Sequence, residues 1–385
     1  MLPNKLQKKL EDRTINNSLR SVGTRNGLID FSSNDYLGFS ISKSIFNRAS
    51  EFLKEHSLEQ NGATGSRLLS GNHKLYELAE QQITQFHQAE SALIFNSGYD
   101  ANVGFFSSVP QRGDLILYDE LCHASIRDGI KMSDAKPYKF KHNNLKDLKR
   151  RCQVQRSRNL DETSEIYVVT ESIFSMDGDQ PDLKELAGFC TKNSFHLIVD
   201  EAHAFGVFGK NGEGLVQQLG LESQVFARLI TFGKALGCHG AAILGSIELK
   251  SYLVNFTRSF MYTTGLPPHS IATVLGGYEE LLKTSKIKSL HSNIAILQKE
   301  IKRNLLQDQF ISSKSAIQSC IIPGNENAKT ISERLKKEGF DVKPILSPTV
   351  PKGQERLRIC VHSFNTEAEI KKLISILADK INLFF

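Results

Sequence analysis

A single lysine, Lys234, follows the apolar run 229–231 and stands among the small residues Gly233, Ala235 and Gly237. Partial removal from water disfavours the charged form of a lysine, and the neutral amine is a nucleophile that can form an imine with an aldehyde. The alternative is an exposed lysine whose stem lies along apolar atoms. If Lys234 is a nucleophile, we expect Gly233 and Gly237 to leave room for its ligand and for close approach of the backbone.

An acid and a histidine, Asp200 and His203, follow a second apolar run. Their spacing allows both side chains to face one ligand. A buried carboxylate at Asp200 is costly unless a cation faces it, and that cation could be an arginine, a metal ion or a protonated pyridine nitrogen. Because no wider set of metal ligands at a familiar spacing accompanies the pair, we expect no metal site. A structural role for both residues is the alternative.

Three more apolar runs end in residues that could do chemistry. Ser97 and Gly98 could turn the chain into a helix whose free N–H groups attract a phosphate. His123 follows the next run, and Glu171 and Ser175 follow the one after. Taken alone, each has a structural explanation as a turn or as a polar group with local bonds.

The apolar runs recur along the chain and predict a sheet. They occupy residues 92–95, 115–118, 166–169, 196–199, 229–231 and 241–244, most of them separated by polar, helix-like stretches. Continuous apolar strands that alternate with helices are typical of a largely parallel sheet covered on both faces. In such sheets ligands bind beyond the carboxyl ends of the strands. The strand ends would therefore combine an anion loop, an aromatic ring, a polar Ser/Glu pair, an acid and a lysine, which suits pyridoxal 5'-phosphate.

The last third of the chain has a different pattern. Residues 291–306 predict a long helix, and 316–324 and 356–362 predict short strands. A closing helix is expected to begin at Thr366, where Glu369 completes a capping box. We therefore expect an N-terminal segment over residues 1–40, a large domain over 41–285 and a small domain over 286–385.

Composition excludes several classes of protein. The chain of 385 residues is 40% hydrophobic, has a net charge of +6, and contains no apolar run near the roughly 18 residues that span a bilayer. The N-terminus lacks the apolar core of a secretory signal, and the six cysteines include no C-x-x-C pair, so we expect a cytoplasmic protein with reduced thiols. The basic patch Lys146–Arg151 is too sparse for nucleic-acid binding, and is either a solvated helix face or a surface for an anionic substrate.

Nine segments together resemble the α-oxoamine synthases, which are pyridoxal-phosphate enzymes of fold type I, the aspartate-aminotransferase fold. They are FSSNDYLG (31–38), GATGSRLLSG (62–71), FNSGYDAN (95–102), HASIRDG (123–129), TESIFSMDGD (170–179), DEAHAFGVFGKNGEG (200–214), TFGKALG (231–237), YTTGLPP (262–268) and SPTVPKGQERLRI (347–359). They follow the family order. The resemblance implies an α/β fold with a mostly parallel seven-stranded sheet in the large domain, a smaller α/β C-terminal domain, and a homodimer with a shared active site.

The resemblance also implies how the cofactor is held. Lys234 would bind its aldehyde, Asp200 would pair with the pyridine nitrogen, and His203 would bond the ring hydroxyl. The other predicted cofactor contacts are Ser175 near that hydroxyl, His123 stacked on the ring, Gly98, Tyr99 and Thr231 at the phosphate, and Thr263 at the phosphate of the neighbouring subunit. Lys234, His123 and Asp200 would be the catalytic residues.

Four further residues would bind substrates. Asn34 and Arg358 would take the carboxylate of the amino acid, Thr349 would line the substrate path, and Arg20 would meet the far end of the acyl substrate. Residues 240–246 are most similar to the family branch that joins L-alanine to a pimeloyl thioester of CoA or acyl carrier protein, in biotin biosynthesis. The alternatives are glycine with an acetyl thioester, serine with a long acyl chain, or a pyridoxal-phosphate fold that binds without catalysis.

Overall fold

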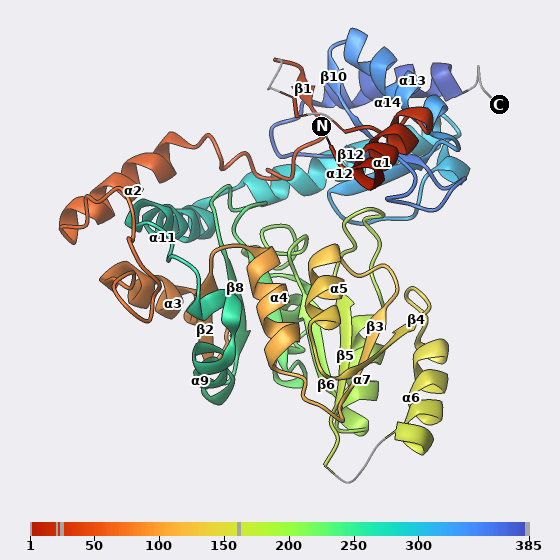
Figure 1. Ribbon diagram of the computed structural model, residues 1–385. Helices are drawn as coiled ribbons and strands as arrows, with labels where there is room; N and C mark the ends of the chain where they lie inside the picture. Colours follow the sequence, from red (N-terminus) through yellow and green to blue (C-terminus); the bar gives the residue numbers. More distant parts are fainter. Residues whose placement is uncertain (1, 21, 24–26, 160–162, 382–385) are drawn as a thin grey trace. The chain divides into compact units, whose positions relative to one another are not determined.

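The structure, a computed structural model, describes residues 2–20, 22–23, 27–159 and 163–381 (Figure 1). The chain divides into two units. The larger unit comprises residues 35–175 and 180–287, and the smaller unit comprises residues 1–34, 176–179 and 288–385. The start of the chain thus shares a unit with its end. The domain limits predicted from the sequence, at 40 and 285, remain predictions.

A seven-stranded sheet forms the centre of the larger unit. Its strands are β2 (Ser91–Phe95), β3 (Leu115–Asp119), β4 (Lys136–Phe140), β5 (Ile166–Glu171), β6 (His196–Asp200), β7 (Ala227–Thr231) and β8 (Ala241–Gly245). In the order β2-β8-β7-β6-β5-β3-β4, β8 is antiparallel to both neighbours and the other pairs are parallel. The predicted α/β fold with a mostly parallel seven-stranded sheet is confirmed.

The degree of burial of each strand explains whether that strand could be predicted from the sequence. Every residue of β2, β5 and β7 is buried, as expected for a sheet with helices on both faces. Strand β4 was not predicted. Its sequence KPYKF contains a proline and two exposed lysines, Lys136 and Lys139, which are typical of an edge strand that must not pair with another chain.

Helices cover this sheet. They are α2 (Lys43–Glu55), α3 (Lys74–Phe86), α4 (Gly98–Ser108), α5 (Ala124–Lys131), α6 (Leu145–Asn159), α7 (Leu183–Lys192), α8 (Leu215–Gln218), α9 (Ile247–Phe256), α10 (Arg258–Met261) and α11 (Pro268–Lys283), with a 3₁₀ turn at Glu222–Gln224. Helices α4 and α5 lie side by side, as do α2 and α11 (Figure 1). In α7 the predicted apolar face is confirmed, since Leu183, Leu186 and Cys190 are all buried.

The smaller unit has its own sheets. Its elements are α1 (Asn4–Ile15), β1 (Ile29–Asp30), α12 (Lys286–Arg303, which begins in the larger unit), a 3₁₀ turn at Gln307–Gln309, β9 (Ile317–Ile321), α13 (Asn325–Lys337), β10 (Phe340–Asp341), β11 (Lys343–Ile345), β12 (Arg356–Cys360) and α14 (Glu367–Ile381). Strands β11, β12 and β9 form an antiparallel sheet, and β1 pairs with β10. The predicted capping box of α14 is present: Thr366 N donates to Glu369 Oε2 at 2.7 Å, and Glu369 N donates to Thr366 Oγ1 at 3.2 Å.

The described helices include none that combines the length and the apolar composition needed to cross a lipid bilayer.

Candidate functional site

A cavity of about 180 Å³ opens at the carboxyl edge of the large sheet. It is lined by Gly98, Tyr99, Asn102, His123, Ser125, Glu171, Asp200, Ala202, His203, Leu229, Thr231 and Lys234. Seven of the residues predicted from the sequence are among them: Gly98, Tyr99, His123, Asp200, His203, Thr231 and Lys234. The parallel strands bring them together, because β5, β6 and β7 all end at this edge.

Lys234 contributes an amine to the lining of the cavity. It is half-buried, and its Nζ lies 2.6 Å from Nε2 of His203. The other ring nitrogen of His203, Nδ1, lies 2.7 Å from the hydroxyl of the buried Tyr36. When Lys234 is protonated it can only donate, so His203 Nε2 accepts and Nδ1–H donates to Tyr36. Tyr36 thereby orients the histidine that faces the amine.

Asp200 is a buried acid that has no ion-pair partner among the described residues. Only 6% of its surface is exposed. Its Oδ2 accepts a hydrogen bond from Asn102 Nδ2 at 2.9 Å, and its Oδ1 accepts one from Ala202 N at 2.9 Å, but no described residue forms an ion pair with it. A buried charge held by amides alone lacks the counter-charge that would stabilise it. A protonated pyridine nitrogen in the cavity would supply that charge, so Asp200 fits the cofactor that the sequence predicts.

His123 and Glu171 face each other at the ends of β3 and β5. His123 caps α5, and its Nδ1 lies 2.7 Å from Ser125 Oγ. Its backbone N–H donates to Glu171 Oε1 at 2.5 Å. Burial lowers the pKa of His123, which favours the neutral ring expected of a stacking partner. Burial, together with the nearby charge of Asp200, raises the pKa of Glu171 to about 8.

The raised pKa of Glu171 predicts a pH dependence of stability. The folded protein retains the Glu171 proton up to about pH 8, while the unfolded chain loses it near the ordinary glutamate pKa of 4.5, so stability falls as pH rises through this window. For one proton the slope is at most about 1.4 kcal/mol per pH unit. We expect Glu171→Gln to flatten the decline between pH 5 and 8, measured by denaturant unfolding at each pH. Glu77→Gln, at an exposed acid of α3, should leave the profile of the wild type unchanged; equal slopes for wild type and Glu171→Gln would contradict the assignment.

The first turn of α4 is suited to an anion. Ser97 caps the helix and accepts a hydrogen bond from Asp100 N at 3.0 Å. A Cβ added to Gly98 would enter the cavity, where it would contact Thr231 Oγ1 at 3.6 Å. The free N–H groups of a helix start and its positive dipole end favour a phosphate here. Gly98, Tyr99 and Thr231 thus have the surroundings that the predicted phosphate contact requires.

Two predicted cofactor residues are not among those that line this cavity. Ser175 lies four residues beyond the end of β5 and is half-buried. Thr263 accepts a hydrogen bond from Asn96 Nδ2 at 3.1 Å through its hydroxyl oxygen. Thr263 was predicted to act on the neighbouring subunit, so its role and that of Ser175 remain predictions.

The four predicted substrate residues form two pairs within the smaller unit. Arg358 Nη2 donates to Asn34 Oδ1 at 3.0 Å, although the two residues are 324 positions apart. Arg20 Nη2 donates to Thr349 Oγ1 at 3.0 Å. The pairing of Arg20 with Thr349 gives Arg20 a fixed partner despite its place on the exposed N-terminal segment. The roles of these four residues stay predictions.

The glycines around Lys234 were predicted to leave room for a ligand and for close approach of the backbone. Gly237 has φ +65°, and a Cβ there would lie 2.2 Å from Ser40 N and 2.5 Å from the carbonyl carbon of Phe39. Gly237 therefore allows the predicted close approach of the backbone, at residues 39–40. Gly233 is exposed, and a Cβ on it would meet no atom closer than 3.8 Å.

Four residues of the site were not assigned a role from the sequence. Asn102 bonds Asp200, Ser125 bonds His123, Tyr36 bonds His203, and Glu171 accepts from the backbone of His123. Asn102 lies one helical turn after Gly98, so it shares the face of α4 that holds Gly98, and this spacing could have identified it. Tyr36 gives no such signal, because its contact with His203 spans 167 positions.

Comparison with known proteins places the chain in a large family. The family model for aminotransferase class I and II matches residues 26–377. The 8-amino-7-oxononanoate synthase of Emericella nidulans is 38% identical over 370 residues, a stretch that covers 91% of this chain and 88% of that relative.

Solved structures are similar over nearly the whole chain. The 8-amino-7-oxononanoate synthase of Francisella tularensis has a TM-score of 0.77 and 28% identity, covering 94% of this chain and 99% of that one. A serine palmitoyltransferase from S. paucimobilis, solved with bound PLP and myriocin, has a TM-score of 0.87 and 25% identity, covering 99% and 97%.

Proposed function

Because the chain belongs to the class I and II aminotransferase family, we propose that its cavity catalyses the condensation of L-alanine with a pimeloyl thioester. The chain is an acyltransferase of the α-oxoamine synthase type in the biotin pathway, and pyridoxal 5'-phosphate is its cofactor. The proposed reaction releases carbon dioxide and the free thiol and gives 8-amino-7-oxononanoate. The observation that carries the proposal is the meeting of the Lys234 amine, His203 and the uncompensated Asp200 in one cavity.

The residues of the cavity fit the cofactor group by group. Lys234 would hold the aldehyde, and Asp200 would face the ring nitrogen, which its buried charge keeps protonated. His203 would bond the ring hydroxyl, and His123 would lie against the ring face. The start of α4 would hold the phosphate. When bound, the cofactor supplies an electron-accepting ring that stabilises the carbanion left when the α-proton of the amino acid is removed.

Lys234 is the group that moves the proton. Lys234 is half-buried and its Nζ is positioned by His203, so its neutral form can take the α-proton of the amino acid and later return a proton to the product. His203, held by Tyr36, can accept a hydrogen bond from the amine in both stages.

Arg358 and Asn34 would bind the amino-acid carboxylate. The planar guanidinium of Arg358 offers parallel N–H donors that match both carboxylate oxygens. The hydrogen bond from Arg358 Nη2 to Asn34 Oδ1 orients this guanidinium. Arg20, bonded to Thr349, would receive the distal carboxylate of the pimeloyl chain in the same way. We further propose a homodimer in which Thr263 reaches the phosphate bound by the partner subunit.

A thiol-release assay separates this proposal from its alternatives. The purified enzyme is offered alanine, glycine or serine, each with pimeloyl-CoA, acetyl-CoA or palmitoyl-CoA. We expect alanine with pimeloyl-CoA to give the highest kcat/KM, and glycine to fall about 10- to 200-fold below alanine because it lacks one methyl group. Mass spectrometry should detect 8-amino-7-oxononanoate.

Two results would overturn the proposal. A preference for serine with palmitoyl-CoA would favour the activity named in the similar serine palmitoyltransferase. Bound cofactor without thiol release from any pair would indicate a protein that binds pyridoxal 5'-phosphate and does not catalyse this reaction.

A further inference from the structure

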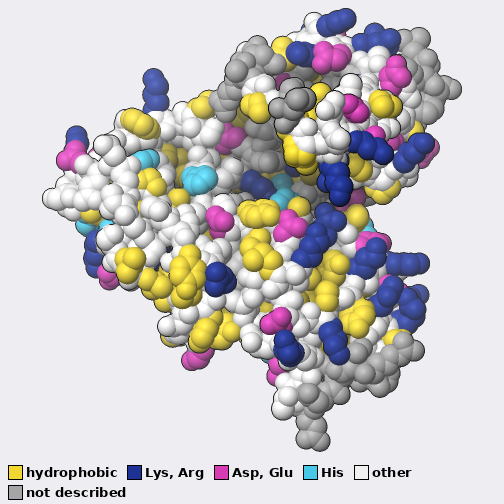
Figure 2. Space-filling view, in the orientation of Figure 1, with side chains coloured by type: hydrophobic (Ala, Val, Ile, Leu, Met, Phe, Trp, Pro, Cys, Tyr) yellow, Lys and Arg dark blue, Asp and Glu magenta, His cyan; other side chains and the backbone are white. Residues whose placement is uncertain are grey.

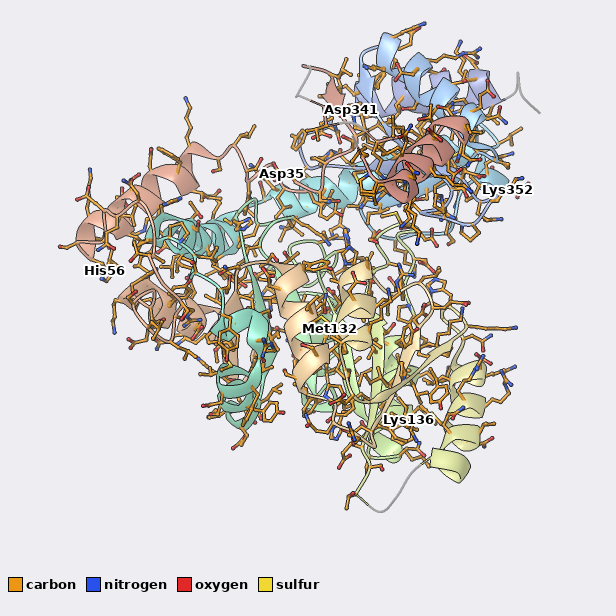
Figure 3. All side chains as sticks on the ribbon, viewed as in Figure 1. Asp35, His56, Met132, Lys136, Asp341 and Lys352 are labelled. Carbon is orange, nitrogen blue, oxygen red and sulfur yellow. The ribbon has the colours of Figure 1, made fainter. Side chains whose placement is uncertain are left out.

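Two helices approach each other closely beside the candidate active site. Helices α4 and α5 lie side by side (Figure 1), and Gly129 permits the contact, because a Cβ on it would lie 2.8 Å from the carbonyl oxygen of Asn102 and 2.9 Å from Cα of Val103. Ser125 lies one helical turn before Gly129, so it comes within reach of Asn102. Figure 3 labels Met132, which follows the last residue of α5. The close approach of the helices thus brings two polar side chains together.

Asn102 donates hydrogen bonds to two groups of the cavity. Its Nδ2 donates to Asp200 Oδ2 at 2.9 Å and to Ser125 Oγ at 3.0 Å. An ionised carboxylate only accepts hydrogen bonds, so the amide nitrogen, and not the amide oxygen, faces Asp200. The backbone N–H of Ala202 donates to the other carboxylate oxygen, Oδ1, at 2.9 Å. Both oxygens of Asp200 are therefore held by donors, which stabilise the charged form of the acid.

Ser125 determines which ring nitrogen of His123 carries the proton. The backbone N–H of Ser125 donates to His123 Nδ1 at 3.2 Å, so Nδ1 itself carries no proton. The hydroxyl of Ser125 accepts from Asn102 and donates to the same Nδ1, at 2.7 Å. The ring of His123 is therefore neutral, with its proton on Nε2. Burial also lowers the pKa of His123, which favours the same uncharged ring.

The polarity of Asn102 is better explained by the site than by helix packing. Asn102 and Ser125 are only 3% and 1% exposed. Figure 2 shows hydrophobic and charged side chains over the region where Figure 1 draws α4 and α5, and the two polar side chains lie beneath that surface. A buried amide costs free energy unless it is hydrogen-bonded, so two packed helices gain nothing from one. Both partners of Asn102, Asp200 and Ser125, line the cavity.

We propose that Asn102 is a positioning residue for the cofactor, which acts on Asp200 directly and on His123 through Ser125. It keeps Asp200 charged at the place where the protonated ring nitrogen would bind, and it keeps His123 uncharged, so that no second cation faces the ring. This inference rests on the proposed function for the roles of Asp200 and His123, and it is independent of the identity of the acyl substrate.

Removal of the amide tests the contact with Asp200. Asn102→Leu keeps the approximate size of the side chain and abolishes both hydrogen bonds. The full-length protein is freed of cofactor and titrated with pyridoxal 5'-phosphate, and the absorption of the bound cofactor gives Kd. We expect Asn102→Leu to raise Kd at least about tenfold, because Asp200 loses a donor to its charged form. Asn102→Ala provides the same test with a smaller side chain, and an unchanged Kd in both variants would overturn the proposal.

A second readout reports the charge of the cofactor ring. The nitrogen that joins Lys234 to the cofactor binds a proton less readily when the ring nitrogen is also positive, since like charges repel. Asn102→Leu weakens the hold of Asp200 on that ring charge, so the pH at which the visible absorption band of the holoenzyme changes should rise by at least about half a unit. Loss of packing alone would lower affinity without moving this midpoint, and an unmoved midpoint would contradict the proposal.

The other groups that titrate at the cavity are the same in wild type and variant. They come from α4 (Tyr99), the start of α5 (His123), β5 (Glu171), the end of β6 and the turn beyond it (Asp200 and His203), and the turn after β7 (Lys234). A difference between the two midpoints therefore reports the loss of Asn102.

Ser125→Ala tests the part of the proposal that concerns His123. It removes the hydroxyl that joins Asn102 to His123 and leaves the hydrogen bond from Asn102 to Asp200. We expect it to raise Kd by about two- to tenfold. The double variant N102L/S125A should raise Kd by less than the product of the two single effects, because both substitutions break one chain of hydrogen bonds. Effects that multiply fully would contradict an action of Asn102 through Ser125.

Asn293→Leu is the matched control. Asn293 on α12 is also buried, and its amide donates to the carbonyl oxygens of His362, at 2.9 Å, and Asn365, at 2.7 Å. The loss of these two bonds should lower the stability of the smaller unit in urea and change Kd for the cofactor by less than about twofold. An equal rise in Kd in Asn293→Leu and Asn102→Leu would show a general effect of losing a buried amide and would overturn the proposal.

The cofactor readouts keep this inference separate from the proposed function. If Asn102→Leu weakens cofactor binding and moves the midpoint, but the wild type releases no thiol from any substrate pair, the positioning role holds and the proposed function alone fails. If the wild type releases thiol and Asn102→Leu has the Kd and the midpoint of the wild type, the positioning role alone fails.

Discussion

Lys234→Ala is expected to lower kcat for thiol release by at least about 1,000-fold, because the same amine removes the α-proton and returns it. Lys234→Arg should be as inactive, since the guanidinium remains protonated and cannot act as a base. The steady-state rate of CoA release from pimeloyl-CoA in the presence of L-alanine measures the effect.

Two controls separate loss of chemistry from loss of structure. Lys192→Ala, at the exposed end of α7, should retain the wild-type rate. Added methylamine should restore part of the activity of Lys234→Ala, because it supplies the missing base in the same cavity. A Lys234→Ala enzyme that keeps more than about a tenth of the wild-type kcat would exclude Lys234 as that base.

Glu201→Ala is expected to destabilise the larger unit by about 3–5 kcal/mol, because it leaves a buried cation without its partner. Glu201 is fully buried, and its Oε2 accepts from Arg228 Nε at 3.0 Å and from Nη2 at 2.9 Å. Its Oε1 accepts from the backbone N–H groups of Leu215 and Val216 at the start of α8. The carboxylate thus joins β7 to α8 directly beside Asp200. Equilibrium unfolding in urea measures the change.

An exposed ion pair provides the comparison. Arg48 and Glu279 join α2 to α11 at 3.0 Å, and both side chains are about one-third exposed. Glu279→Ala should therefore cost about 1 kcal/mol or less. If Glu201→Ala cost no more than Glu279→Ala, the buried pair would not stabilise the fold in the way described.

The position of the candidate site at the carboxyl edge of the sheet could be predicted because it follows a general rule of parallel sheets. Lys234, Asp200 and His123 each come shortly after an apolar run, and parallel strands place such positions at one edge. The periodicity of α7 and the capping box of α14 are equally local signals, and the structure confirms both. Reactive residues that follow strands, and periodicity or capping within one helix, can therefore be predicted from a single sequence.

Features that depend on distant contacts could not be predicted. The N-terminal strand β1 pairs with β10, where Ile29 lies opposite Phe340, and two residues carry too little pattern to reveal such a pairing. Arg228 looks like an interruption of the apolar run of β7 until Glu201 is placed beside it. Gly237 owes its conformation to the backbone of Phe39 and Ser40, about 200 positions away. Each of these features depends on a contact between residues that are far apart in the sequence, so it could not be predicted from the local sequence.

The central claim is that Lys234 is the residue that binds the aldehyde of the cofactor, and one measurement tests it most directly. The holoenzyme is reduced with borohydride, which fixes the bond between lysine and cofactor, and is then digested and analysed by mass spectrometry. We predict a phosphopyridoxyl group on the peptide that contains Lys234 and on no other peptide. A modification on a different lysine, or a folded and cofactor-loaded enzyme with no modified lysine, would contradict the account.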